Sequence, residues 1–199
     1  AKEMGVPVKT LICASNENKV LYDFFRTGTY DRNRDFILTT SPSMDILISS
    51  NLERLIYLSA GSDAKANAAL MKELSEKGSY TVTEEMLGGF ASEEENRATI
   101  KKIFEDTGYL IDTHTGVAAS VYNHYKEETK DPAKTVIAST ASPYKFSGSV
   151  LEAIDGVLAE LSGVVIPQAV EEIRTAPVRH TAECGIDQMQ ATVAGILSV

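Results

Sequence analysis

The sequence is poor in cysteine and histidine, and this shortage argues against metal binding. Among 199 residues there are two cysteines, Cys13 and Cys184, and three histidines, which lie far apart along the chain. Neither set has the short ligand spacing of a structural zinc site, so no metal is expected. Cys13 lies within an apolar strand pattern and Cys184 in a polar turn, so we expect reduced thiols, which are typical of a cytoplasmic protein.

Long apolar runs and basic clusters are absent as well, which excludes two classes of partner. No stretch approaches the ~18–20 continuous apolar residues of a membrane-spanning helix, and the chain does not open with the apolar core of a secretory signal. Its 28 acidic residues outnumber 19 basic ones, giving a net charge of −9, and the longest basic cluster is Lys101-Lys102. Because nucleic-acid binding needs a clustered basic face, we expect neither nucleic acid nor a membrane as partner.

The familiar nucleotide-binding and hydrolase motifs are missing too. The sequence contains no G-x-G-x-x-G, no P-loop and no G-x-S-x-G. A Ser-x-x-Lys pattern at Ser142 and Lys145 recurs at Ser62 and Lys65, as short patterns do by chance. It lacks the Ser-Asp-Asn and Lys-Thr-Gly motifs that accompany it in penicillin-recognising enzymes, so we assign it no function.

The chain does contain alternating strand and helix patterns. Its 43% hydrophobic and 24% charged residues are typical of a globular protein, and 199 residues suffice for one or two domains. Val8–Ala14 and residues 134–139 read as buried strands, and Tyr80–Val82 as a weaker one. Parallel sheets are usually covered on both faces and need more strands than this. We therefore expect an α/β fold with an incomplete, mostly parallel sheet flanked by helices.

Capping residues and the spacing of apolar residues locate the expected helices. These helices run from Asn16 to Gly28, from Ser43 through Ile56, over 64–77, from Ser92 to Gly108, from Thr113 or Thr115 onward, over 143–161 and over 187–197. Ala1–Met4 reads as the last turn of a helix that stops at Gly5, so we expect the body of that helix to precede the chain.

The most informative stretch is Thr135–Phe146. Its apolar, β-branched residues end in a cluster of small hydroxyl residues, and a Ser-Pro pair then opens a helix. In an open α/β sheet, ligands bind where the carboxyl end of a strand meets the next helix. Ser139, Thr140, Ser142 and the first backbone N–H groups of that helix therefore suit a polar cofactor atom or an anion.

Residues 139–146, Ser-Thr-Ala-Ser-Pro-Tyr-Lys-Phe, resemble the Thr-Ala-(His/Ser)-Pro-x-Lys-Phe signature of threonine synthases. Further stretches resemble the same family in the same order, namely Ala14–Asn18, Thr40–Ile46 leading to Ser50–Arg54, Ile111–Thr115, and Pro177–His180 with Cys184. The resemblance covers nearly the whole chain. It implies a tryptophan-synthase-β-like fold, the cofactor pyridoxal 5'-phosphate (PLP), and conversion of O-phospho-L-homoserine and water to L-threonine and phosphate.

The same resemblance implies that this chain is the C-terminal part of such an enzyme. The family's Schiff-base lysine and its Gly-rich phosphate loop would both precede Ala1, so we expect the isolated chain to be inactive and to contain no catalytic residue. Residues 1–155 would belong to the PLP-binding catalytic region, truncated at its N-terminus. Residues 156–199 would form a C-terminal helical tail that packs on it. The missing N-terminal part of the chain is then an expected partner.

Thr140 is the leading site residue. The resemblance implies that its hydroxyl meets the pyridine nitrogen of PLP. A hydroxyl is too weak an acid to hold that nitrogen protonated, as an Asp would, so the ring would stay closer to neutral. The alternative is that Thr140 only caps the next helix.

The remaining candidates each have a structural alternative. Asn16 and Asn18 follow a strand and either face a ligand or cap a helix. Ser41, Ser43 and Asn51 either hold the phosphate of the phosphorylated amino-acid substrate or form a turn and an N-cap.

The last candidates lie at a second predicted helix start. Asp112, His114 and Thr115, with Thr113 between them, either form a wall of the site or simply begin a helix. A histidine at a helix N-terminus tends to stay neutral, because the macrodipole disfavours added positive charge. The neutral imidazole suits hydrogen bonding to a substrate.

Two other functions remain open at this point. One is another PLP-dependent lyase of the serine or threonine dehydratase type, which the Ser-Pro-Ser-Met-Asp-Ile stretch disfavours. The other is a non-catalytic module that binds a partner. Since the unpaired edge of the strand at Val8–Ala14 is a template for association, the fragment is also expected to be capable of forming a homo-oligomer.

Overall fold

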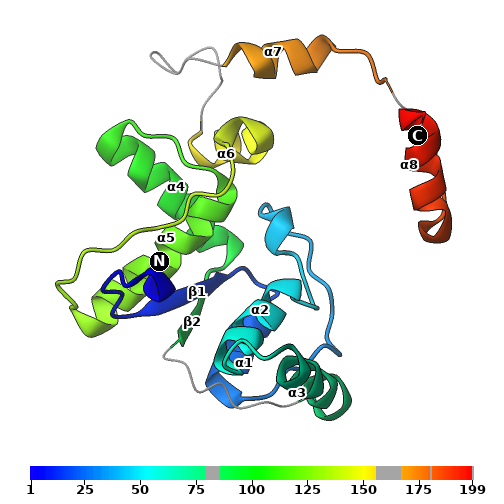
Figure 1. Cartoon of the computed structure of the whole chain (residues 1–199). Coiled ribbons are helices and arrows are strands. Elements are labelled where there is room, and N and C mark those ends of the chain that lie inside the picture. Colours follow the sequence, from blue (N-terminus) through cyan, green and yellow to red (C-terminus); the bar gives the residue numbers. More distant parts are fainter. Residues whose placement is uncertain (79–85, 156–166, 180, 199) are drawn as a thin grey trace. The chain divides into compact units, whose positions relative to one another are not determined.

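The computed structural model describes residues 1–78, 86–155, 167–179 and 181–198 (Figure 1). The chain divides into two compact units, Ala1–Ser162 and Gly163–Val199. The predicted boundary at residues 155–156 and the predicted packing of the tail stay predictions, because residues 156–166 lie outside the described part. Within the described residues, no helix is long and apolar enough to cross a membrane, and no three metal-ligating side chains come together.

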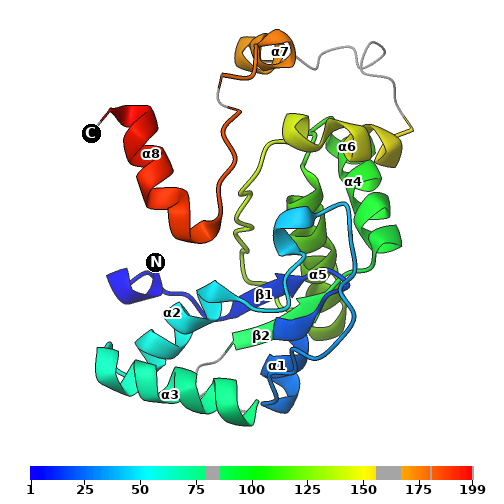
Figure 2. The ribbon, with the colours of Figure 1, turned by 90° about the vertical axis from the view of Figure 1, so that its right-hand side faces the viewer.

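A two-stranded parallel sheet forms the centre of the first unit. Strand β1 (Leu11–Ser15) pairs with β2 (Met86–Phe90), with Leu11 opposite Met86 and Ser15 opposite Phe90. Helices cover this sheet on both faces (Figure 2). The prediction of an α/β fold with an incomplete parallel sheet flanked by helices is confirmed.

Two adjacent glycines of β2 allow helices to approach both faces of the sheet. Successive residues of a strand point to opposite faces. A Cβ on Gly88 would lie 3.0 Å from the Cα of Tyr22 in α1 (Val20–Thr27), and one on Gly89 would overlap Val121 of α5 (Thr113–Thr129). Helices α1 and α5 therefore lie on opposite faces, in contact with the strand backbone.

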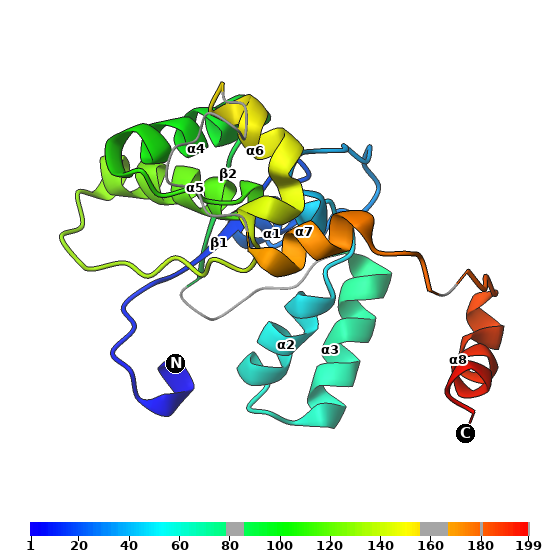
Figure 3. The same ribbon diagram turned by 90° about the horizontal axis from the view of Figure 1, so that it is seen from above.

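The other helices of the first unit form pairs around this centre. Helices α2 (Ser50–Ser59) and α3 (Ala64–Lys77) lie side by side, as do α4 (Glu93–Thr107) and α5 (Figures 1 and 3). The shorter elements are η1 (Lys2–Met4), η2 (Pro42–Met44), η3 (Pro143–Phe146) and α6 (Ser147–Ala153). The second unit contains α7 (Gln168–Thr175), η5 (Ile186–Gln188) and α8 (Met189–Leu197).

The buried apolar residues form three clusters in the first unit. The first is built around Phe24 and Ile56 and joins α1, α2 and α3. The second, around Ile100 and Val150, joins α4 to α6. The third places Val117 and neighbouring residues of α5 against the sheet. The last cluster fixes the N-terminal end of α5 beside the carboxyl end of β1.

Most predicted helix ends are confirmed. Gly28, Gly78 and Gly108 each adopt a left-handed conformation directly after a helix, with φ of 72°, 69° and 69°. Ser92 and Glu95 form the predicted capping box at the start of α4. These ends depend on local hydrogen bonds, which the residues themselves specify.

Other expectations are corrected. Residues 134–139, predicted as a strand, run back along α5 as a single stretch without strand pairing, because no described strand lies beside them (Figures 1 and 2).

The helix expected from Ser43 is split into η2 and α2, which begins only at Ser50. The helix expected over 143–161 appears as η3 and α6, and its remainder falls outside the described residues. Tyr80–Val82 also lies outside them, and β2 and α7 were not predicted.

Candidate functional site

Two asparagines after β1 anchor the polar loop that precedes α2. Asn16 and Asn18 are almost completely buried. The Asn16 side-chain amide donates to Ser41 Oγ at 3.1 Å and to Asp45 Oδ1 at 2.7 Å. The Asn18 side-chain amide donates a hydrogen bond to the backbone carbonyl of Ile37 at 2.8 Å, and its oxygen accepts one from the backbone N–H of Ile37 at 3.0 Å. Neither side chain caps α1, whose first residue follows Lys19, so both hold the loop against the end of the strand.

The N-terminus of α5 contains a second buried polar group. Asp112 is completely buried and accepts hydrogen bonds from the backbone N–H groups of His114 at 2.8 Å and Thr115 at 3.3 Å. It also accepts from the Thr115 hydroxyl and contacts His114 Nδ1 at 3.1 Å. One carboxylate thus caps the helix and orients two side chains of its first turn.

The hydrogen bonds of His114 assign its protonation state. The backbone N–H of Ser43 donates to His114 Nε2 at 3.1 Å, and a ring nitrogen that accepts a hydrogen bond has no proton. The proton therefore lies on Nδ1, directed at Asp112, and the imidazole is neutral. Both ring nitrogens are engaged within the protein, so His114 joins α5 to the loop at Ser43.

A third segment joins the same cluster. The hydroxyl of Thr115 lies 2.9 Å from that of Ser139. A continuous chain of contacts therefore runs from Ser139 through Thr115, Asp112 and His114 to the backbone of Ser43. It connects residues 41–45, 112–115 and 139, which are distant in sequence and meet beyond the carboxyl end of β1.

The predicted site residues divide into two groups. Those buried in the cluster are Asn16, Asn18, Ser41, Asp112, His114 and Thr115. Ser43 contributes its backbone and leaves its side chain exposed, while Asn51 is exposed in the first turn of α2 and makes none of the cluster's hydrogen bonds. Thr140 is exposed, and among the described residues its hydroxyl has no hydrogen-bond partner. The helix after it is capped by Ser142, which accepts from the N–H of Tyr144 at 3.4 Å, so Thr140 is not the cap.

Several residues of the cluster were not singled out from the sequence. The Asp45 carboxylate accepts hydrogen bonds from the side-chain amides of Asn16 and Asn18. It also accepts hydrogen bonds from the backbone N–H and the hydroxyl of Thr39. Glu93, in the first turn of α4, accepts from the backbone N–H of Thr40 at 3.0 Å. The position of Asp45 in the Ser-Pro-Ser-Met-Asp stretch was a usable signal, whereas Thr39 and Glu93 carry no distinctive pattern.

The two thiols are expected to differ in reactivity. Burial in β1 raises the pKa of Cys13 to about 11, whereas Cys184 is exposed. Since the thiolate is the reactive form, we expect a thiol reagent at about pH 8 to modify Cys184 rapidly and Cys13 only after unfolding in urea. Counting modified thiols against time would check this, with Cys184→Ser as the control that leaves only the slow reaction. Rapid modification of both thiols in the folded chain would contradict it.

A parallel sheet covered by helices on both faces defines the chain as part of an α/β protein. Its buried polar residues lie beyond the carboxyl end of β1, which is the end of the sheet where ligands of such proteins bind. A family model described as "Threonine synthase, C-terminal" matches residues 115–193. Threonine synthase of Saccharomyces cerevisiae is 35% identical in an alignment that covers 88% of this chain and 38% of that protein. The human protein "Threonine synthase-like 1" is 37% identical in an alignment that covers 77% of this chain and 22% of that protein.

Solved structures give the same result. The PLP-bound threonine synthase of Brucella melitensis is similar with a TM-score of 0.70 and 35% identity, over 87% of this chain and 37% of that one. The yeast enzyme is similar with a TM-score of 0.79 and 28% identity, over 99% of this chain and 44% of that one. The chain belongs to the threonine synthase family and is similar to its C-terminal part. It spans less than half the length of these relatives.

Proposed function

We propose that this chain forms the C-terminal part of a threonine synthase. The whole enzyme would convert O-phospho-L-homoserine and water to L-threonine and phosphate, and the isolated chain would be inactive. The observation that carries the proposal is the hydrogen-bonded chain from Ser139 to Ser43. It joins segments 41–45, 112–115 and 139, each of which resembles the family, at the position in the fold where ligands of α/β proteins bind.

The geometry around Thr140 fits one contact to the pyridine ring of PLP. The neighbouring Ser139 is held by Thr115, while the Thr140 hydroxyl is exposed and without a partner among the described residues. When bound, PLP would supply the electron sink for elimination and replacement on the substrate. Thr140 would orient the ring nitrogen through a neutral hydrogen bond and, as a weak acid, would leave that nitrogen unprotonated.

The loop residues divide into structural and substrate-facing roles under this proposal. Ser41 is completely buried and bonded to Asn16, so it maintains the loop. Ser43 and Asn51 expose their side chains and are the proposed ligands of the substrate phosphate. His114, with both ring nitrogens engaged, would hold the backbone of Ser43 in position and so act on the substrate only through the loop.

The function can be tested in a chimera in which this chain replaces the matching 38% of the yeast enzyme. We expect the chimera, but not the isolated chain, to release phosphate from O-phospho-L-homoserine. Thr140→Ala should lower kcat by up to about tenfold, because one neutral hydrogen bond contributes about 0.5–1.5 kcal/mol. The amount of bound PLP, measured by its absorbance, should stay the same.

Two variants control this experiment. Thr140→Ser keeps the hydroxyl and should retain most of the turnover. Thr181→Ala removes another exposed threonine, in the second unit, and should have no effect. If Thr140→Ala turned over like the parent chimera with an unchanged cofactor spectrum, Thr140 would not contact the ring. Phosphate release by the isolated chain would contradict the proposal as a whole.

A further inference from the structure

Two adjacent hydroxyl residues, Ser139 and Thr140, follow the segment that runs back along α5, and their hydrogen bonding differs. Ser139 Oγ lies 2.9 Å from Thr115 Oγ1, whereas the Thr140 hydroxyl has no hydrogen-bond partner among the described residues. Both residues are exposed, but Thr115 is buried in the first turn of α5. Which of the two hydroxyls can donate to a ligand depends on where the proton of Ser139 points.

The proton of Ser139 is assigned by Asp112. The Thr115 hydroxyl donates its proton to Oδ2 of Asp112. Because a hydroxyl has one proton, Thr115 can only accept from Ser139, so Ser139 is the donor in that bond. In the opposite direction, the oxygens of Thr115 and Asp112 would face each other without a proton between them, at a completely buried carboxylate. The protons therefore point from Ser139 to Thr115 and from Thr115 to Asp112.

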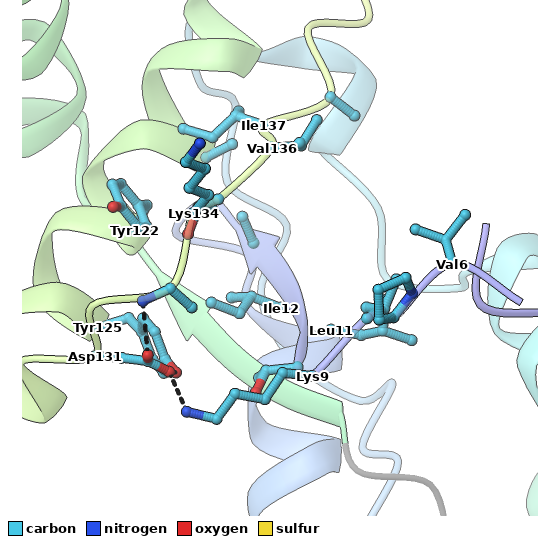
Figure 4. A pocket seen from close by; sticks show the side chains of 18 residues that line it. Val6, Lys9, Leu11, Ile12, Tyr122, Tyr125, Asp131, Lys134, Val136 and Ile137 are labelled. Carbon is cyan, nitrogen blue, oxygen red and sulfur yellow. Dashed lines mark hydrogen bonds and ion pairs between the residues drawn. The ribbon is translucent and has the colours of Figure 1, made fainter.

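The segment that leads to these hydroxyls is anchored at its beginning by Asp131. Its carboxylate accepts hydrogen bonds from Lys9 Nζ at 2.6 Å and from the backbone N–H of Ala133 at 2.9 Å (Figure 4). Beyond this anchor, residues 133–138 line a cavity of about 600 Å³, together with residues 6–12. Packing on the cavity side therefore does little to fix the course of the segment.

The far end of the segment is anchored by Thr115. Most of residues 134–141 are exposed. Within the part of the chain that the structure describes, residues 134–141 make one hydrogen bond, the one from Ser139 to Thr115. Thr140 is the next residue, so the position of its backbone depends on this bond.

We propose that Thr115 is a positioning residue, which holds Thr140 in place through Ser139. The proposal rests on the proposed function, in which Thr140 contacts the pyridine nitrogen of PLP. Asp112 completes the arrangement, because it takes the Thr115 proton and leaves the Thr115 oxygen as the acceptor for Ser139. Since the Ser139 proton points to Thr115, Thr140 is the one of the two adjacent hydroxyls that can donate to the nitrogen.

A double-mutant cycle in the chimera tests whether Thr115 acts through Thr140. Thr115→Val keeps the shape of the side chain but removes the hydroxyl. We expect kcat to fall by about threefold to tenfold, and by no more than in Thr140→Ala, with an unchanged KM for O-phospho-L-homoserine. In the Thr140→Ala background, the same substitution should lower kcat by less than about twofold, because the residue that it positions is gone. Equal losses in the two backgrounds would overturn the proposal.

Three further variants separate this role from a general loss of stability. Ser139→Ala removes the same bond from its exposed end and should lower kcat as Thr115→Val does, while Thr115→Ser keeps the hydroxyl and should retain most of the turnover. Ser120→Ala is the matched control, because Ser120 is a buried hydroxyl of α5 that donates to Thr99 at 2.8 Å. It should leave kcat unchanged. A loss of kcat in Ser139→Ala but not in Thr115→Val would show that Ser139 contacts the ligand itself, and would overturn the proposal.

Relaxation of backbone ¹⁵N nuclei gives a readout that needs no PLP. In the isolated chain, the order parameter of the Thr140 N–H should fall from near the ~0.85 of rigid backbone to about 0.6 or less in Thr115→Val and in Ser139→Ala. Ser120→Ala should not change it. An unchanged order parameter in the first two variants would overturn the positioning role even if the chimera were active. An unchanged kcat in Thr140→Ala would instead reject the proposed contact with PLP, and the relaxation data would still decide whether Thr115 holds Thr140.

Discussion

Replacing Asp112 with alanine should destabilise the isolated chain by about 3 kcal/mol or more. Asp112 is completely buried and is the shared acceptor for two backbone N–H groups, the Thr115 hydroxyl and His114 Nδ1. Loss of an N-cap alone costs about 1 kcal/mol, but each buried donor left without an acceptor adds about 1–3 kcal/mol. The chain of contacts between Ser139 and Ser43 would also be broken at its centre.

The measurement is urea denaturation of the isolated chain followed by circular dichroism. With a slope of about 2 kcal/mol/M, the midpoint should fall by about 1.5 M or more. Asp63→Ala is the matched control, because Asp63 caps α3 through two backbone N–H groups at an exposed position. Water can replace that carboxylate, so its loss should cost only about 1 kcal/mol. Equal costs for the two variants would show that the cluster around Asp112 adds nothing to an ordinary cap.

Local features of the fold were readable from the sequence because their causes are local. Helix α3 has its predicted bounds of Ala64–Lys77, with Gly78 as its stop. The capping box at Ser92 and Glu95 is likewise contained within four residues. In both cases the hydrogen bonds that end the helix connect groups one turn apart, so distant parts of the chain cannot alter them.

The strands were less predictable because pairing depends on distant residues. Strand β2, Met-Leu-Gly-Gly-Phe, contains a glycine pair that disfavours a strand by propensity. It forms because Gly88 and Gly89 admit α1 and α5 against the two faces of the sheet. Residues 134–139 show the converse case. Their composition favours a strand, but in the described structure they have no neighbour to pair with.

The site was predictable in its segments but not in its connections. The sequence predicts a role for the side chain of Ser43, whereas in the structure the backbone N–H of Ser43 makes the contact with His114. Backbone groups have no sequence signature, so only the folded arrangement identifies this contact. Asp45 and Thr39, which hold the two asparagines, are ordinary loop residues until β1 and the loop are brought together.

Gly116→Ala should destabilise the chain by about 2 kcal/mol, although alanine is the better helix former by about 1 kcal/mol. Gly116 lies in α5 at its contact with α4. An added Cβ would overlap Asn96 Oδ1 and lie 2.8 Å from Ile100 Cγ1. Both neighbours are almost completely buried, so neither can move aside into solvent. Overpacking of such a site costs up to about 3 kcal/mol, which exceeds the gain in helix propensity.

Gly148→Ala is the matched control for this prediction. Gly148 also lies in a helix, α6, but nothing lies within 4 Å of the position its Cβ would take. That substitution should therefore stabilise the chain by up to about 1 kcal/mol. In thermal melts of the isolated chain, the two variants should shift Tm in opposite directions, by about 2–4 °C for each kcal/mol. If Gly116→Ala raised Tm as Gly148→Ala does, helices α4 and α5 would not pack as closely as the structure has them, and the first turn of α5 would not be held where Thr115 reaches Ser139.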